Sequence, residues 1–198
     1  MIFLSLLIII FVSTFWFQTA RLYDVSQNAP KATFNFEAAC LSCCLKDDDV
    51  GFAGGLDKSV KSLDLIKGSS LIIGSHQEAI SCINWSSTSN ILFTGGWDGN
   101  VKSWDTRKSG TLSNISCSER VYSMSLTDTR VVIATANRQI LIYDARNLNV
   151  PEQIRESPLK FQTRKISCFP DGSGFAIGSI EVRCRFIRAY AQIVTSYR

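Results

Sequence analysis

Residues 95–105 read Gly-Gly-Trp-Asp-Gly-Asn-Val-Lys-Ser-Trp-Asp, and residues 54–64, forty-one positions earlier, read Gly-Gly-Leu-Asp-Lys-Ser-Val-Lys-Ser-Leu-Asp. The aspartate that closes this phrase recurs along the chain at steps of 40, 41 and 39 residues: it stands at Asp24, Asp64, Asp105 and Asp144. A fixed period of this length indicates one structural unit that is built repeatedly and stacked on its neighbours.

The residues inside one period predict short strands. The best unit contains Ala79–Trp85, Ile91–Gly96 and Asn100–Asp105, and the next repeats them as Arg120–Leu126, Arg130–Thr135 and Gln139–Asp144. Each run is rich in β-branched and aromatic residues, and turn-prone segments separate the runs. Helical periodicity is absent from the body of the chain. The predicted fold class is therefore all-β: a partial WD-repeat β-propeller with three recognisable four-stranded blades, blade fragments and a hydrophobic N-terminal segment.

The repeat pattern divides the chain into three parts. Residues 1–19 are a hydrophobic segment expected to lie outside the propeller, residues 20–181 are the partial propeller, and residues 182–198 are a divergent tail. Residues 1–17 have the length of a signal-peptide core or a short membrane span, but they lack the basic residues with which a signal peptide usually begins. Two interpretations stay open: non-coding sequence read through at both ends, or a genuine membrane-targeting segment. An open arc of blades also predicts uncovered strand edges, and hence low solubility or pairing with another arc.

Composition excludes several classes of function. The chain has 198 residues, of which 45% are hydrophobic and 19% charged, a composition typical of folded proteins. The net charge of +4 is spread without dense basic blocks, so direct nucleic-acid binding is not expected. Seven cysteines at irregular spacing predict buried free thiols in a reducing compartment. Cys40 and Cys43 lack the second ligand pair of a zinc site, and the chain has one histidine. We therefore expect no metal, no cofactor and no enzymatic activity.

The WD-repeat pattern implies a role for that histidine. His76 resembles the histidine that enters a blade, and Asp98 resembles the aspartate of the tight turn before the third strand. By this resemblance His76 should hydrogen-bond to Asp98, and Thr94 and Trp104 should complete a buried polar relay that fixes the turn. Asp57 and Asn137 hold the position of Asp98 in the neighbouring units, but no histidine precedes them, so their relays are expected to be incomplete.

The segments between the repeats are more specific. Residues 120–126, 142–148, 151–166 and 178–181, together with residues 20–25 and 95–107, resemble the spindle-assembly-checkpoint WD-repeat family that partners the Bub kinases. The mRNA-export propellers are the related branch. The resemblance implies a non-enzymatic adaptor that binds a glutamate-rich peptide motif of checkpoint kinases, in the nucleus and at kinetochores with a cytoplasmic pool. The alternatives are a nucleoporin-binding mRNA-export protein, a membrane-anchored WD-repeat protein, or a non-functional truncated product.

The same resemblance implies which residues bind the peptide. Trp97 and Arg164 match binding positions on the top face, Leu56 occupies the equivalent turn one blade earlier, and Tyr122 and Arg138 are expected at the rim. An indole supplies a rigid apolar anchor and a guanidinium binds carboxylates through two donors. The alternatives are core packing for Trp97 and a solvated charge for Arg164.

A phosphorylated kinetochore scaffold is a second partner implied by the resemblance. The basic residues that bind phosphate in the family belong to later blades that this sequence does not continue into. Arg183 and Arg185 are not their equivalents, so a phosphopeptide site is not predicted from these residues.

Overall fold

The computed structural model describes residues 9–14, 18–24, 29–107, 110–181, 184–188 and 194–195. The strands are β1 (Ile9–Thr14), β2 (Thr19–Asp24), β3 (Ala29–Asn35), β4 (Cys40–Leu45), β5 (Val50–Gly55), β6 (Ser59–Asp64), β7 (Ser69–Ser75), β8 (Ile80–Ser86), β9 (Ile91–Gly96), β10 (Asn100–Asp105), β11 (Thr111–Ser116), β12 (Val121–Leu126), β13 (Arg130–Thr135), β14 (Gln139–Asp144), β15 (Gln153–Glu156), β16 (Thr163–Cys168), β17 (Gly174–Ser179), β18 (Cys184–Arg188) and β19 (Val194–Thr195). One 3₁₀ turn, η1, spans Ala136–Arg138.

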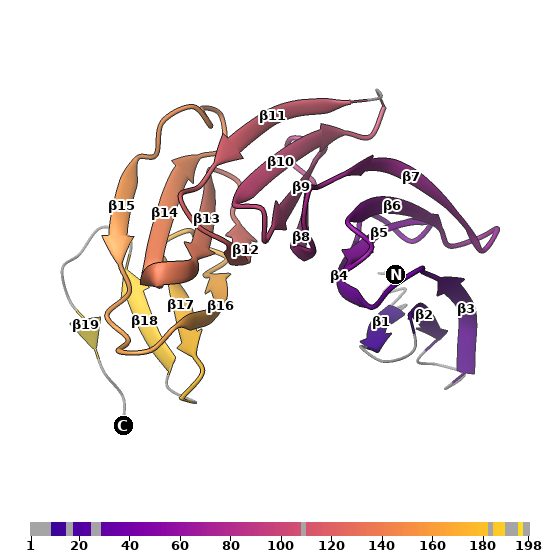
Figure 1. Cartoon of the computed structure of the whole chain (residues 1–198), viewed down its shortest axis with the longest axis horizontal. Coiled ribbons are helices and arrows are strands. Elements are labelled where there is room, and N and C mark those ends of the chain that lie inside the picture. The colour runs from indigo at the N-terminus through magenta and orange to yellow at the C-terminus, as the bar shows by residue number, and fades with distance from the viewer. Residues whose placement is uncertain are drawn as a thin grey trace, which may run out of the picture.

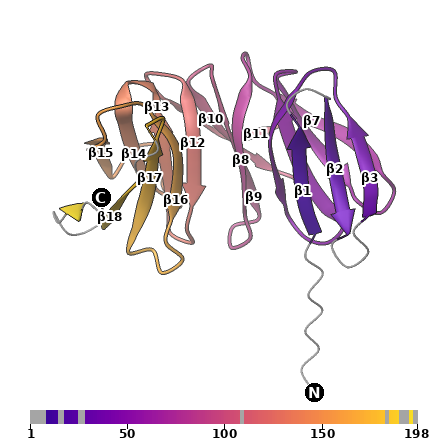
Figure 2. The ribbon, with the colours of Figure 1, turned by 90° about the horizontal axis from the view of Figure 1, so that it is seen from below.

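The strands of the described residues form five antiparallel sheets. The first has three strands in the order β1-β2-β3, and the other four are β4–β7, β8–β11, β12–β15 and β16–β19. Figures 1 and 2 show these sheets side by side in chain order along an arc, like blades. The predicted fold class is confirmed, and strands β9, β10, β13 and β14 begin and end at the predicted residues.

Each blade runs from an inner strand to an outer strand. The inner strands β4, β8, β12 and β16 contact one another in sequence. The outer strands β7, β11 and β15 each pair with one neighbour only. Between the blades lie four clusters of buried apolar side chains, the largest of which joins the blades of β8 and β12. The core is therefore divided between neighbouring blades, as stacked repeats require.

One backbone hydrogen bond recurs in the first four sheets and defines equivalent positions. The carbonyl of a turn residue with positive φ accepts from the first residue after the outer strand. The donor–acceptor pairs are Phe36–Gln18, His76–Lys58, Cys117–Gly99 and Ser157–Arg138, at 2.7–2.8 Å. Gln18 occupies this place between β1 and β2, so β1 stands where the second strand of a blade stands elsewhere.

The two ends of the chain therefore differ from the expected division. Strand β1 lies within the segment expected outside the propeller, and it pairs with β2 from Ile9↔Asp24 to Thr14↔Thr19. Its β-branched residues favour an extended strand. Beyond residue 181, β18 pairs with β17 and β19 with β18, so the last sheet continues into the segment expected to be a divergent tail. Residues 1–8, 15–17 and Arg183 lie outside the described residues. The part of the chain that the structure describes has no apolar helix long enough to span a bilayer.

Candidate functional site

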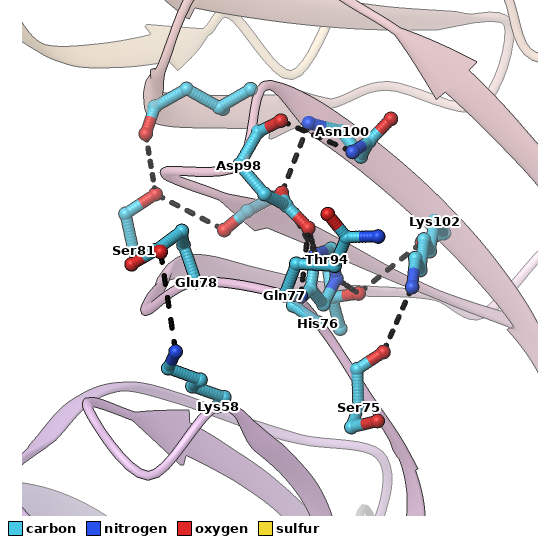
Figure 3. A network of polar contacts seen from close by, with 12 residues as sticks. Lys58, Ser75, His76, Gln77, Glu78, Ser81, Thr94, Asp98, Asn100 and Lys102 are labelled. Atoms are coloured by element: carbon cyan, nitrogen blue, oxygen red, sulfur yellow. Dashed lines mark hydrogen bonds and ion pairs between the residues drawn. The ribbon is translucent and has the colours of Figure 1, made fainter.

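The structure brings His76, Thr94, Asp98 and Trp104 together in one polar relay, and Figure 3 shows the first three of these residues. His76 Nδ1 lies 3.1 Å from Asp98 Oδ2, and His76 Nε2 lies 2.8 Å from Thr94 Oγ1. Trp104 Nε1 donates to the same Thr94 oxygen at 2.8 Å. Strands β9 and β10 supply Thr94 and Trp104, while His76 follows β7 and Asp98 lies in the β9–β10 turn. The relay therefore fixes the turn to the strand that precedes it.

The charges of the relay are set by its surroundings. Burial lowers the pKa of His76 below its usual value, although the hydrogen bond to Asp98 acts in the opposite direction. Burial acts to raise the pKa of Asp98, but the backbone amides of Gln77 and Asn100, followed by His76, hold it below its usual value. The neutral imidazole then donates a hydrogen bond from Nδ1 to the carboxylate and accepts a hydrogen bond at Nε2 from the Thr94 hydroxyl. Every polar group of the relay has a partner.

The preceding blade holds the equivalent turn with a different group. Phe36 stands where His76 stands, and Lys61 turns inward to pair with Asp57, its Nζ 3.1 Å from Oδ2. Both side chains are buried, at 9% and 3% exposure. The ammonium also lies 4.4 Å from the centre of the Phe36 ring. The relay at Asp57 is incomplete, as expected, and a lysine replaces the histidine as the donor to the carboxylate.

The next blade, whose turn contains Asn137, uses neither group. Cys117 takes the place of His76 there. Asn137 donates instead to Glu119 Oε1 at 3.0 Å, on the exposed surface. Of the three turns compared among the described residues, at Asp57, Asp98 and Asn137, one is held by histidine and one by lysine.

The predicted peptide-binding residues come from a single end of the sheets. The first residue of each inner strand pairs with the last residue of the second strand, as in Ile80↔Gly96 and Val121↔Thr135. The turns that contain Leu56, Trp97 and Arg138 therefore lie beside the starts of β4, β8, β12 and β16. We call this end the top face. Tyr122 and Arg164 are the bulged second residues of β12 and β16, and so lie on it.

Of the five residues, Tyr122 and Arg164 are in direct contact. The Arg164 guanidinium carbon lies 4.9 Å from the centre of the Tyr122 ring. Arg164 is exposed, and no acidic side chain within the described residues pairs with it. A guanidinium held against an aromatic ring keeps its N–H donors free at the edge.

The other three are placed differently. Leu56 is 43% exposed. Trp97 is half-buried, and its buried indole Nε1 has no hydrogen-bond acceptor among the described residues. Arg138 forms an ion pair with Glu156 and donates to the Lys160 carbonyl at 3.1 Å, so its guanidinium is already engaged. The sequence analysis did not identify Lys61. The pattern that could have indicated it is an aspartate in the turn combined with an apolar residue at the position of the histidine.

The cysteines of the described residues are free thiols. Cys40, Cys82 and Cys117 are buried. Burial raises the pKa of Cys43 and Cys44 to about 12, so these thiols keep their protons at neutral pH. In the described part of the chain no three His, Cys, Asp or Glu side chains gather into a group that could hold a metal ion.

Comparison with known proteins gives the same class. Residues 68–105 match the family described as WD domain, G-beta repeat. The mitotic checkpoint protein BUB3.1 of Arabidopsis thaliana is 43% identical over 173 residues, which is 85% of this chain and 51% of that protein. The mitotic checkpoint protein bub-3 of Caenorhabditis elegans is 34% identical over 173 residues, 85% of this chain and 50% of that protein. The poly(A)+ RNA export protein of Schizosaccharomyces pombe is 38% identical over 179 residues, again 85% and 50%.

The blades and the relay define a WD-repeat propeller protein. Residues 68–105 match a WD repeat. The chain is similar to mitotic checkpoint and mRNA-export proteins, which confirms the resemblance found in its sequence. The chain spans about half the length of the curated relatives it matches.

Proposed function

We propose that the chain is a non-enzymatic adaptor of the mitotic checkpoint that binds glutamate-rich peptide segments of checkpoint kinases on its top face. Its similarity to two mitotic checkpoint proteins supports the process. The proposed place of action is the nucleus and the kinetochore. A phosphorylated kinetochore scaffold is not assigned to this chain.

The observation that carries the proposal is the Tyr122–Arg164 pair. The guanidinium is exposed, lies against an aromatic ring and has no acidic partner among the described residues. A glutamate of an extended peptide supplies the carboxylate that this arginine lacks, and two parallel hydrogen bonds fix the orientation of the peptide. Trp97 and Leu56 offer apolar surface on the same face.

The test is the affinity of the full chain for a synthetic glutamate-rich peptide from a checkpoint kinase, measured by fluorescence anisotropy. We expect Arg164→Glu to weaken binding at least tenfold, because it places like charges together. The control Arg107→Glu makes the same charge change in the turn after β10, at the opposite end of the blade, and should bind like the wild type. Equal loss in both variants, with circular dichroism unchanged, contradicts the proposed site.

The mRNA-export branch supplies the second candidate. The poly(A)+ RNA export protein of S. pombe and the mRNA export factor GLE2 of Chaetomium thermophilum are 38% and 36% identical to this chain. A nucleoporin peptide that competes with the kinase peptide and binds at least tenfold more tightly assigns the chain to export instead.

A further inference from the structure

A hollow lies at the end of the sheets opposite the top face, where three inner strands finish. Its walls come from the ends of β8, β12 and β16 and from the turns that follow them, and its volume is about 340 Å³. Figure 2 shows the turns after β8 and β16 at the lower end of the sheets. We call it the lower hollow. A hollow of this size falls within the range of ligand-binding pockets.

Two aromatic rings in the wall of the lower hollow are held in place by other rings. Trp85 stacks on Phe52, with the ring centres 5.5 Å apart, and Phe169 stacks on Phe186 at 6.0 Å. Trp85 and Phe169 are half-buried, so each keeps some surface open to solvent. Leu126 adds apolar surface from the blade between them. Fixed aromatic surface of this kind binds apolar side chains at little cost in entropy.

Asp128 is the one charged residue among the described residues that line the lower hollow. It is exposed, and its Oδ1 accepts from the Thr88 hydroxyl of the preceding blade at 2.6 Å. No lysine, arginine or histidine of the described residues pairs with it. Arg130, two positions further on, forms an ion pair with Glu152 instead. One carboxylate oxygen is therefore fixed, and the other is open to a cation from outside.

The chemistry of the lower hollow favours an arginine flanked by apolar residues. A guanidinium pairs with a carboxylate through two donors and also lies well against an aromatic ring, whereas an ammonium acts as a point charge. The apolar neighbours of that arginine would cover the rings and Leu126, which free arginine would leave uncovered. The glutamate-rich segment proposed for the top face does not suit this site, because its charges repel Asp128.

We propose that the lower hollow binds an extended segment of a partner protein in which an arginine stands between apolar residues. The arginine pairs with Asp128, and its neighbours pack on Trp85, Leu126 and Phe169. The site lies at the opposite end of the sheets from Arg164, so both ends can be occupied at once. Its failure would leave the function proposed for the top face unaffected.

The experiment is fluorescence anisotropy of the full chain with the labelled peptide Gly-Ser-Leu-Arg-Leu-Ser-Gly and with a second peptide that has norleucine in place of arginine. We expect the arginine peptide to bind at least tenfold more tightly. Asp128→Asn keeps an oxygen for Thr88 but removes the charge, so it should abolish this preference. The control Asp48→Asn removes the same charge from an exposed turn at the same end, after β4 and outside the lower hollow, and should bind like the wild type.

Ser87→Lys tests the site without changing Asp128. Ser87 is exposed and lines the lower hollow, so a lysine there supplies the missing cation and should weaken binding of the arginine peptide at least tenfold. Circular dichroism checks that each variant is folded, and Ser87→Lys decides the test if Asp128→Asn is not. Three results overturn the proposal: no preference for the arginine peptide, equal losses in Asp128→Asn and Asp48→Asn, or unchanged binding in folded Ser87→Lys.

Discussion

Phe36, His76, Cys117 and Ser157 all donate the same backbone hydrogen bond, yet they secure their turns in different ways. His76 is neutral and satisfied on both ring nitrogens. Phe36 has no polar atom to offer, and the buried Lys61 approaches Asp57 from the next strand instead. A buried carboxylate is tolerated where a donor reaches it, whichever side chain supplies that donor.

The histidine makes the relay sensitive to pH. Because the folded pKa of His76 lies below its unfolded value of 6.5, the unfolded chain takes up a proton that the folded chain does not. The free energy of unfolding should be constant above pH 6.5 and fall below it, by at most about 1.4 kcal/mol per pH unit. Since the chain has one histidine, His76→Gln should remove this slope. Urea unfolding from pH 7.5 to 5 measures it, and an unchanged slope in the variant contradicts the assignment.

Lys61 should contribute more to stability than its counterpart Lys102. Lys61→Met leaves the Asp57 carboxylate buried without its cation, which destabilises the fold by about 3–5 kcal/mol. Lys102→Met is the matched control one blade later. Its ammonium donates to the Ser75 carbonyl at the exposed surface, so the loss there should stay below about 1 kcal/mol. Equal losses in urea unfolding would show that Asp57 does not depend on Lys61.

At the scale of the strands, the sequence predicted some elements better than others. The second and third strands of a blade were found because they are apolar, like β9 and β10, and because the third closes on the repeated aspartate, as β10 does at Asp105. Outer strands such as β11 and β15 lack that pattern, because one side faces solvent and only a few side chains pack. Strand β1 was missed because a uniformly apolar run has no period by which to recognise a strand.

The candidate site could be predicted only as far as the repeat gives equivalent positions. His76, Asp98, Thr94 and Trp104 fall at fixed places in one repeat, and the structure brings them together. The contact of Arg164 with Tyr122 joins two neighbouring blades. The two residues lie forty-two positions apart, so no pattern within a single repeat predicts their contact.

The contact between β7 and the next blade should not tolerate a side chain at Gly74. A Cβ there would lie 2.2 Å from the ring of Trp104, whose indole also belongs to the relay. Gly74→Ala should therefore displace the indole and destabilise the fold by about 1–3 kcal/mol. Near-ultraviolet circular dichroism and urea unfolding measure both effects. Ser70→Ala, on the exposed part of β7, is the control. An unperturbed tryptophan signal in Gly74→Ala contradicts the close packing.

At the scale of the whole molecule, serines connect each inner strand to the next. Ser42 Oγ accepts from the Ile83 amide, Ser81 Oγ donates to the Val121 carbonyl, and Ser123 Oγ accepts from the Ile166 amide. Among the described residues the main contacts of each blade are thus with its neighbours, which is the condition under which repeats transmit stability from neighbour to neighbour.

Ser123→Ala should therefore loosen one end of the arc and not the other. The variant leaves the buried Ile166 amide without an acceptor, at a cost of about 1–3 kcal/mol. Hydrogen exchange should speed up in β16 and β17 and stay unchanged in β4–β6. Ser42→Ala frees the Ile83 amide in the same way, so it should speed up exchange at the β4–β8 contact and leave β16 protected. If either variant accelerates exchange equally in all blades, the arc unfolds as one unit and the neighbour-to-neighbour description is wrong.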